Sequence, residues 1–306
     1  MRSHGLHVGL FVALAALSAS PRGSPGIALG LGTLLAVTLG NPLPQAKVWS
    51  KPLLQVCVVL LGFGMDLGVI LDAGRKGMLF AAISIALTLV AGALLGQWLG
   101  IERSISALIS AGTAICGGSA IAAVGSVIGA SGAEMSVAMG TVFVLNAVAL
   151  VLFPLLGHAL GLTQEQFGLW AGVAIHDVSS VVGAGTAYGP DALHIATAVK
   201  LSRTLWIIPI TLLAALAFRV RAARPQIPWF IGLFLLASVA RGAVPGLAAA
   251  SVAIVTVARA GFAVVLFFIG AGISLPTLRA VGWRPMAQGV VLWLLISVVA
   301  LFAAWR

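Results

Sequence analysis

The residues of this sequence best placed to do chemistry are ionisable side chains that lie inside apolar stretches. His176, Asp177, Lys200 and Arg203 lie close together along the chain, and Asp66 lies in a separate apolar stretch. An ionised side chain at the centre of a bilayer costs roughly 2.5 to 3.5 kcal/mol on insertion scales, so each of them needs a partner, a cavity or a function. These five residues are therefore the candidates for substrate binding and ion coupling.

The run AIHDVSSVVGAG contains the acidic and imidazole members of this set. On a continuous helix His176, Ser179 and Ser180 share one face, and Asp177 lies about 100° around the axis. We interpret His176 and Asp177 as an ion-coupling pair and the two serines as substrate contacts. The alternative is a satisfied hydrogen-bond cluster between helices. Asp66 is either a further coupling residue or a solvated residue at the end of its span.

The run KLSRTLWIIP places Lys200 and Arg203 on one helix face. Two like charges so close repel each other unless an anion or a carboxylate compensates them. An arginine fork is well shaped for a tetrahedral oxyanion, so this pair predicts an anion site. The alternative is a structural salt bridge from Asp177 to either residue.

The run GTAICGGSAI interrupts an apolar segment with Cys116, Gly117, Gly118 and Ser119. Adjacent glycines weaken a helix, and a broken helix at membrane depth occurs only where the freed backbone groups line a cavity or are buried in protein. The second half-helix would then direct its free N–H groups into the cavity, which favours an anion. The alternative is a close helix crossing at small residues. In the span 134–157, we expect the side-chain amide of Asn146 to form a hydrogen bond to a neighbouring helix.

These residues are embedded in a sequence that is 61% hydrophobic and only 8% charged, with a mean hydropathy of +1.15. Such a composition excludes a soluble globular protein and predicts a lipid bilayer around the chain. The net charge of +10 comes from scattered basic residues, which argues against nucleic acid as a partner. Motifs of nucleotide-binding, hydrolytic or metal sites are absent from the sequence, so we expect neither an enzyme nor a cofactor other than a coupling H⁺ or Na⁺.

An apolar window predicts an all-α polytopic membrane protein with about 10–11 transmembrane helices in a single domain over residues 1–306. The candidate spans are 5–20, 24–40, 52–72, 77–99, 104–129, 134–157, 165–186, 191–218, 227–242, 259–275 and 286–304. Residues 1–20 also resemble a cleaved signal peptide. Residues 244–258 are predicted to form an interfacial helix.

The distribution of basic residues between the loops favours a cytoplasmic N-terminus. Two local similarities indicate internal repeats. Gly62, Gly64, Leu67, Gly74 and Met78 recur in register as Gly270, Gly272, Leu275, Gly282 and Met286. Gly112, Ala114, Ile115, Ser119 and Gly125 recur as Gly172, Ala174, Ile175, Ser179 and Gly185. The first pair of spans would run in opposite directions, as inverted repeats do. The second pair would run in the same direction, and shared composition is its alternative explanation. A face of small residues favours a homodimer.

The four motifs KPLLQVCVVLLGFGMDL, GTAICGGSAI, AIHDVSSVVGAG and ATAVKLSRTLWIIP, in this order, resemble the YeiH-like family of bacterial inner-membrane proteins described as sulfate exporters. That family is distantly similar to bile-acid/sodium symporters and cation/proton antiporters. The resemblance implies inverted repeats, helices broken at mid-membrane, and an elevator-like movement of a core against a scaffold.

The sequence therefore predicts a secondary transporter of a small, sulfate-like anion with proton or sodium coupling. The predicted substrate-binding residues are Cys116, Gly117, Gly118, Ser119, Ser179, Ser180, Lys200 and Arg203, and the predicted ion-coupling residues are His176, Asp177 and Asp66. One alternative is a cation/proton antiporter in which Asp177 carries the ion. The other is a membrane component that transports nothing.

Overall fold

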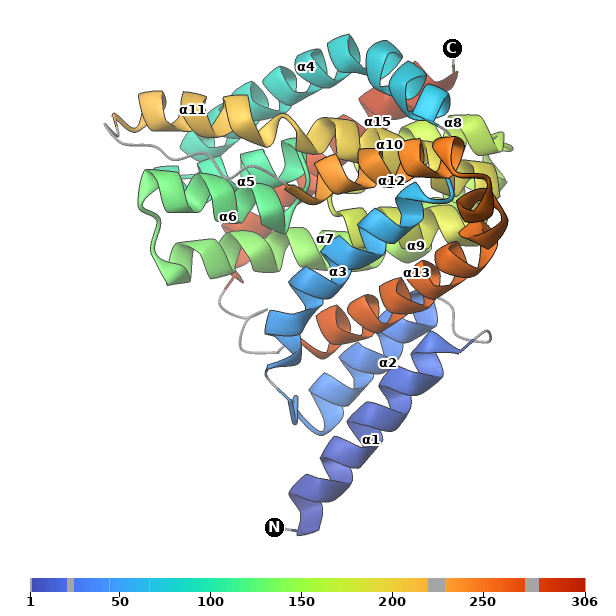
Figure 1. Cartoon of the computed structure of the whole chain (residues 1–306). Helices are drawn as coiled ribbons and strands as arrows, with labels where there is room; N and C mark the ends of the chain where they lie inside the picture. The colour runs from blue at the N-terminus through green and yellow to red at the C-terminus, as the bar shows by residue number, and fades with distance from the viewer. Residues whose placement is uncertain are drawn as a thin grey trace. The chain divides into compact units, whose positions relative to one another are not determined.

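The computed structural model describes residues 2–20, 25–43, 45–65, 67–219, 229–272 and 281–305, which form helices joined by short turns (Figure 1). These ranges contain no strand. Among the described residues, five helices are long and apolar enough to cross a membrane, and shorter apolar helices accompany them. The five are Leu79–Trp98, Gly132–Ala159, Pro190–Ala217, Ala249–Ala271 and Trp283–Trp305. The predicted all-α membrane fold is confirmed.

The chain divides into two compact units, of which the first comprises residues 1–71 and 229–275. Its helices are α1 (Arg2–Ala19), α2 (Pro25–Thr38), α3 (Ala46–Gly62), α12 (Trp229–Ala243) and α13 (Pro245–Ala271). Within this unit α13 packs against α1, α2 and α3. Gly32 of α2 and Gly270 of α13 allow this close approach, because a Cβ at either position would overlap the backbone of the other helix.

Helix α13 is continuous where an interfacial helix was expected over residues 244–258, so that prediction is wrong. Val244 is the N-cap residue, Pro245 occupies the first turn, and the helix then runs for 27 residues to Ala271. Proline is tolerated in the first turn of a helix because its missing N–H has no partner there. Arg259, the first residue of the predicted span 259–275, lies instead inside the span Ala249–Ala271.

The second unit comprises residues 72–228 and 276–306 and contains all the described candidate site residues. Helix α4 (Leu67–Trp98) begins in the first unit and continues into the second. The remaining helices of the second unit are α5 (Arg103–Ala114), α6 (Gly118–Ile128), α7 (Gly132–Ala159), α8 (Gln164–Ala174), α9 (Val178–Tyr188), α10 (Pro190–Thr204), α11 (Ile207–Ala217) and α15 (Trp283–Trp305). Helices α10 and α11 form one span with an interruption at Leu205 and Trp206.

Helices α5 and α6 form an antiparallel pair, here named the first hairpin (residues 103–128). Late in α5, a Cβ at Gly112 would lie 2.9 Å from the Ile121 side chain, early in α6. Toward the other ends, a Cβ at Gly125 would lie 3.5 Å from Leu108. Each helix is 11 or 12 residues long, which is about 17 Å at 1.5 Å per residue, or roughly half a bilayer core.

Helices α8 and α9 form a second antiparallel pair, here named the second hairpin (residues 164–188). The ring of Tyr188, at the end of α9, stacks on Phe167 in the first turn of α8 with centroids 3.8 Å apart. The Tyr188 hydroxyl donates a hydrogen bond to the Leu162 carbonyl, just before α8 begins. The chain therefore returns to its starting level after the second hairpin, as it does after the first.

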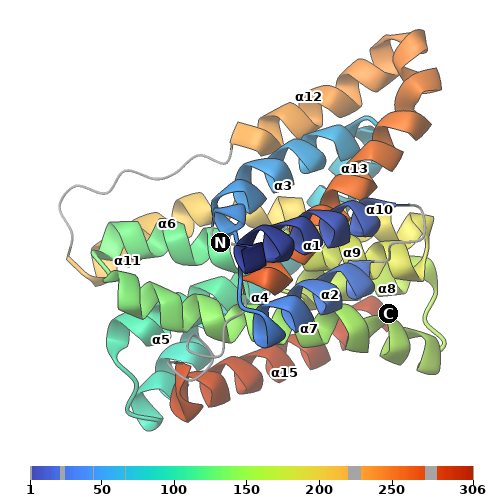
Figure 2. The same ribbon diagram turned by 90° about the horizontal axis from the view of Figure 1, so that it is seen from below.

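The two hairpins enter the second unit from opposite ends of α7. At the first end, Ser104 of the first hairpin donates a hydrogen bond to Glu134 in the first turn of α7. At the other end, His158 in the last turn of α7 stacks on Tyr188 with centroids 4.3 Å apart. Figures 1 and 2 show α5 and α6 toward one end of this unit and α8 and α9 toward the other.

This geometry corrects the prediction that residues 104–129 and 165–186 each cross the membrane. The interruption predicted at Gly117 and Gly118 is present, and a second one, which was not predicted, separates α8 from α9 at residues 175–177. The chain reverses at each of them. Two half-length apolar helices have the same length and composition as one full span, so hydropathy does not distinguish a re-entrant hairpin from a crossing.

Candidate functional site

The turns of the two hairpins meet inside the second unit. We name residues 115–117 the first tip and residues 175–177 the second tip. Gly117 has φ +65° and ψ −125°, a conformation that is essentially restricted to glycine. A Cβ at Gly117 would lie 3.5 Å from Asp177 Cβ and 3.6 Å from the His176 carbonyl oxygen. The two sequence motifs that were predicted to carry chemistry are therefore in direct contact.

The first tip leaves the N-terminus of α6 without a side-chain cap. The Ile121 N–H makes the first bond of the helix, to the Gly117 carbonyl at 3.1 Å, and the N-cap Gly117 has no side chain to offer. Gly118 is half-buried and Ser119 is exposed, whereas Cys116 is buried. The first N–H groups of α6 are therefore reachable, and they carry the positive end of the helix dipole.

The second tip has a cap of its own. Asp177 is the N-cap residue of α9, and its Oδ2 accepts hydrogen bonds from the Ser180 N–H and the Ser180 hydroxyl, both at 3.0 Å. Ser179 donates to the same oxygen. The His176 N–H donates to Asn146 Oδ1 at 3.0 Å, which ties this tip to α7. Asp177, Ser179 and Ser180 thus form one capping cluster, and Asn146 bridges helices as predicted.

Lys200 and Arg203 lie in α10 behind the first tip, and both are fully buried. Lys200 Nζ donates to the Ile115 carbonyl at 3.4 Å. Arg203 donates to the Ala114 carbonyl and, at 2.8 Å, to the Ser84 hydroxyl of α4. Both cations thus bind the carbonyl end of α5, where the helix dipole is negative.

This arrangement explains how two like charges are buried side by side. The carbonyl groups at the end of α5 compensate the two charges. The sequence had led us to expect a bound anion or the carboxylate of Asp177 in this role. For the residues that the structure describes, the hydrogen bonds of Asp177 go to serines and those of Lys200 and Arg203 go to carbonyls and Ser84. The alternative of a structural salt bridge is not observed among them.

Several buried polar atoms around the tips have no partner among the described residues. They are both ring nitrogens of His176, Asn146 Nδ2, Thr113 Oγ1 and Arg203 Nε. Buried polar groups are normally hydrogen-bonded, so a cluster of unpaired ones marks a place where water or a ligand completes the bonding. His176 is fully buried and lies within Coulombic reach of Lys200 and Arg203.

The structure thus brings most of the predicted site residues together. They are Cys116, Gly117, Gly118 and Ser119 at the first tip, His176, Asp177, Ser179 and Ser180 at the second tip, and Lys200 and Arg203 in α10. Asp66 lies outside the described residues. Sequence reasoning missed Ser84 and Thr113, because serine and threonine are common in apolar helices. It also missed the carbonyl groups of α5, which no residue type identifies.

Fold and site together define a class, namely an all-helical membrane protein in which two re-entrant hairpins meet around buried charges. The chain belongs to the family described as "Conserved hypothetical protein 698", whose model matches residues 5–289. The predicted membership of a YeiH-like family is confirmed.

Relatives in this family are named UPF0324 membrane proteins. The chain is 51% identical to one from Bacteroides thetaiotaomicron over 280 residues, which cover 90% of this chain and 84% of the relative. It is 50% identical to one from Porphyromonas gingivalis over 280 residues, covering 90% and 85%. It is 45% identical to one from Geobacter sulfurreducens over 304 residues, covering 99% and 98%. No solved structure matches the chain.

Proposed function

We propose that the protein is a secondary transporter of a small anion, sulfate-like in charge and size, that binds where the two tips meet. The observation that carries this proposal is the uncapped N-terminus of α6 in front of two fully buried cations. Helix N-termini bind oxyanions through free backbone N–H groups. Among the described residues at the tips, Asp177 is the one acidic side chain, and it lies near the two cations Lys200 and Arg203. The net charge at the tips is therefore positive.

The first turn of α6 would provide the direct ligands. Gly118 is half-buried and Ser119 is exposed, so an anion could approach this end of the helix. Lys200 and Arg203 would act from behind the tip, since their described hydrogen bonds hold α5. Their field is strong there because both side chains are removed from water. Direct contact of these two side chains with the anion stays a prediction.

Coupling to protons would involve His176. An imidazolium at this position would add a third positive charge beside Lys200 and Arg203, whereas a bound anion would attract that charge. Anion binding and proton uptake would therefore support each other, which is the reciprocity that a symporter needs. Both ring nitrogens lack a hydrogen-bond partner among the described residues, so neither is committed to another group.

The test is uptake of radiolabelled sulfate by purified protein in liposomes, with and without a pH gradient. The decisive variant is Ser119→Asp, because a tethered carboxylate at the N-terminus of α6 competes with the anion and stabilises the helix. We expect at least a tenfold loss of uptake in Ser119→Asp and near-normal uptake in the matched neutral variant Ser119→Asn. Uptake that survives Ser119→Asp would disprove the anion site.

The same liposomes separate this proposal from its alternatives. A pH gradient that collapses on addition of Na⁺, without sulfate uptake, would establish a cation/proton antiporter with Asp177 as the carrier. That role needs an available carboxylate, whereas Asp177 is buried and bonded to Ser179 and Ser180. Absence of both activities in correctly folded protein would leave a component that transports nothing.

A further inference from the structure

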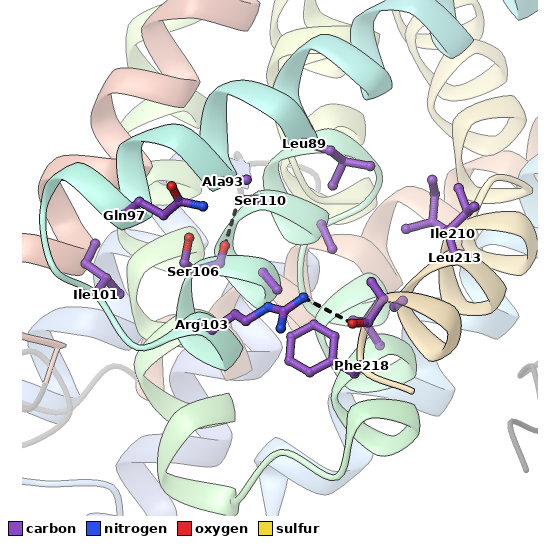
Figure 3. Close-up of a pocket in the computed structure, with 16 residues that line it drawn as sticks. Leu89, Ala93, Gln97, Ile101, Arg103, Ser106, Ser110, Ile210, Leu213 and Phe218 are labelled. Atoms are coloured by element: carbon purple, nitrogen blue, oxygen red, sulfur yellow. Dashed lines mark hydrogen bonds between the residues drawn. The ribbon is translucent and has the colours of Figure 1, made fainter. Parts of the chain in front are cut away.

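A cavity of about 420 Å³ opens beside the first hairpin, between α4, α5 and α11 of the second unit. Figure 3 shows Leu89 and Ala93 of α4 on one side and Ile210 and Leu213 of α11 on the other. The floor is α5, and polar groups gather toward the end of the cavity where α5 begins. They are Gln97, Arg103, Ser106 and Ser110.

The apolar walls of this cavity continue into surfaces that face lipid. Leu94 of α4 is 63% exposed, and Leu213 and Leu216 of α11 are 57% and 75% exposed. In a chain that spans a membrane, exposed apolar faces of this kind contact acyl chains. The cavity is therefore a cleft in a lipid-facing surface, and its natural filling is hydrocarbon.

Arg103 gives the cavity a charged end. Its Nη2 donates to the Ala217 carbonyl at 3.1 Å, and its guanidinium lies 4.7 Å from the centroid of the Phe218 ring. Within the described ranges this is the one hydrogen bond of its side chain, so donors of the five-donor guanidinium remain for an anion.

We propose that this cavity binds an anionic phospholipid, with one acyl chain along α5 and the phosphate on Arg103. The acyl chain matches the apolar walls, and the phosphate matches the guanidinium of Arg103 at the end of the cavity. Basic pockets between transmembrane helices bind anionic lipid headgroups in this way. A free anion would leave the apolar cleft unfilled. A zwitterionic lipid also carries a phosphate, but its ammonium group offsets the attraction of that phosphate to Arg103.

The bound lipid would stabilise the first hairpin, because α5 forms the floor of its site. The lipid proposal does not depend on the proposed transport activity, since lipid binding is measured directly. Either proposal can therefore be disproved without affecting the other.

The experiment is native mass spectrometry of the full chain in neutral detergent with phosphatidylglycerol or phosphatidylcholine, combined with thermal unfolding. We expect phosphatidylglycerol to remain bound and to raise the unfolding temperature, and phosphatidylcholine to do neither. Arg103→Gln removes the charge and is expected to lower phosphatidylglycerol occupancy about tenfold, which corresponds to the loss of one charge-assisted contact. Ala93→Phe fills the cleft where the acyl chain would lie, and we expect a loss of similar size.

Matched controls separate the site from general effects. Val90→Phe places the same phenyl ring at an exposed position of α4 that does not line the cavity, and Arg284→Gln removes a charge outside it. Both are expected to bind phosphatidylglycerol normally. Equal binding of the two lipids, or full occupancy in Arg103→Gln and Ala93→Phe, would overturn the proposal. Stabilisation by glycerol phosphate equal to that by phosphatidylglycerol would show that the cavity recognises a free anion, and would overturn it as well.

Discussion

Arg203 joins three helices through a single side chain. It lies in α10, donates to the last carbonyl of α5 and donates to the Ser84 hydroxyl of α4 at 2.8 Å. Breaking a buried charged network leaves an uncompensated charge, which costs far more than the net gain of forming it. The buried charge of Arg203 therefore has two effects: it makes the first tip electropositive, and through its bonds to α5 and α4 it fixes the position of that tip.

We expect the Arg203–Ser84 bond to appear as a coupling energy. Ser84→Ala should cost about 1.5–3 kcal/mol of unfolding free energy in the wild type, as for a hydrogen bond to a charged group, and little in an Arg203→Met background. Denaturant unfolding in detergent measures both values. Thr197→Val is the control, because Thr197 bonds only the Leu193 carbonyl of its own helix at 2.7 Å among its described contacts, and its effect should be additive with Arg203→Met.

Gly117 is the residue on which the first tip depends most directly. Its ψ of −125° lies outside the ordinary left-handed region, and a Cβ at this position would lie 3.3 Å from the Val142 side chain. Gly117→Ala should therefore cost roughly 2–3 kcal/mol of stability. Gly129→Ala, at φ +70° and ψ 29° with open space around it, should cost only about 1 kcal/mol. Equal thermal stability of the two variants would contradict this account of the tip.

At the scale of elements, the sequence identified one of the two helix breaks, but not how the chain continues after it. The glycine pair after Cys116 indicated an interruption, whereas His176 and Asp177 were expected on a continuous helix; the structure has a tip at both places. The reversal depends on contacts between residues far apart in the chain, such as Phe167 with Tyr188, which no local pattern contains. The partners of Lys200 and Arg203 were unpredictable for the same reason, since they are backbone carbonyls.

The second local similarity of the sequence coincides with the two hairpins. Ile115 and Ile175 lie in the tips, and Ser119 and Ser179 lie in the first turns of α6 and α9. Because the hairpins enter from opposite ends of α7, such a match is what inverted units would give. The inverted repeat itself stays a prediction. The first similarity falls partly outside the described residues.

Labelling of single cysteines distinguishes hairpins from crossings. In a background that lacks Cys57 and Cys116, cysteines at Glu102 and Ser131 should react with an impermeant reagent from one face of the membrane. Cysteines at Thr163 and Asp191 should react from the other face. All four positions are exposed in the structure. If the segments crossed the membrane, each pair would be split between the two faces.

At the scale of the whole molecule, the charges at the two hairpin bases favour one orientation. Arg103, Arg219 and Arg284 lie at the base of the first hairpin, whereas Glu165 and Asp191 lie at the base of the second. Cytoplasmic loops carry the excess of basic residues. We therefore expect the first hairpin to enter from the cytoplasm, and the reaction of Ser131→Cys in inverted but not in right-side-out vesicles to demonstrate it.

Coupling of sulfate uptake to a pH gradient would depend on the whole molecule, and a variant of His176 tests it. If this imidazole carries the coupled proton, His176→Gln should keep sulfate exchange at equilibrium but lose the stimulation of uptake by a pH gradient. The reason is that an amide can occupy the buried site without binding a proton. His158→Gln is the matched control, because His158 is exposed and stacks on Tyr188 at the base of the second hairpin. It should retain the full response to the gradient. A His176→Gln protein that still concentrates sulfate in response to pH would transfer the coupling role to Asp177, the other titratable residue of the second tip.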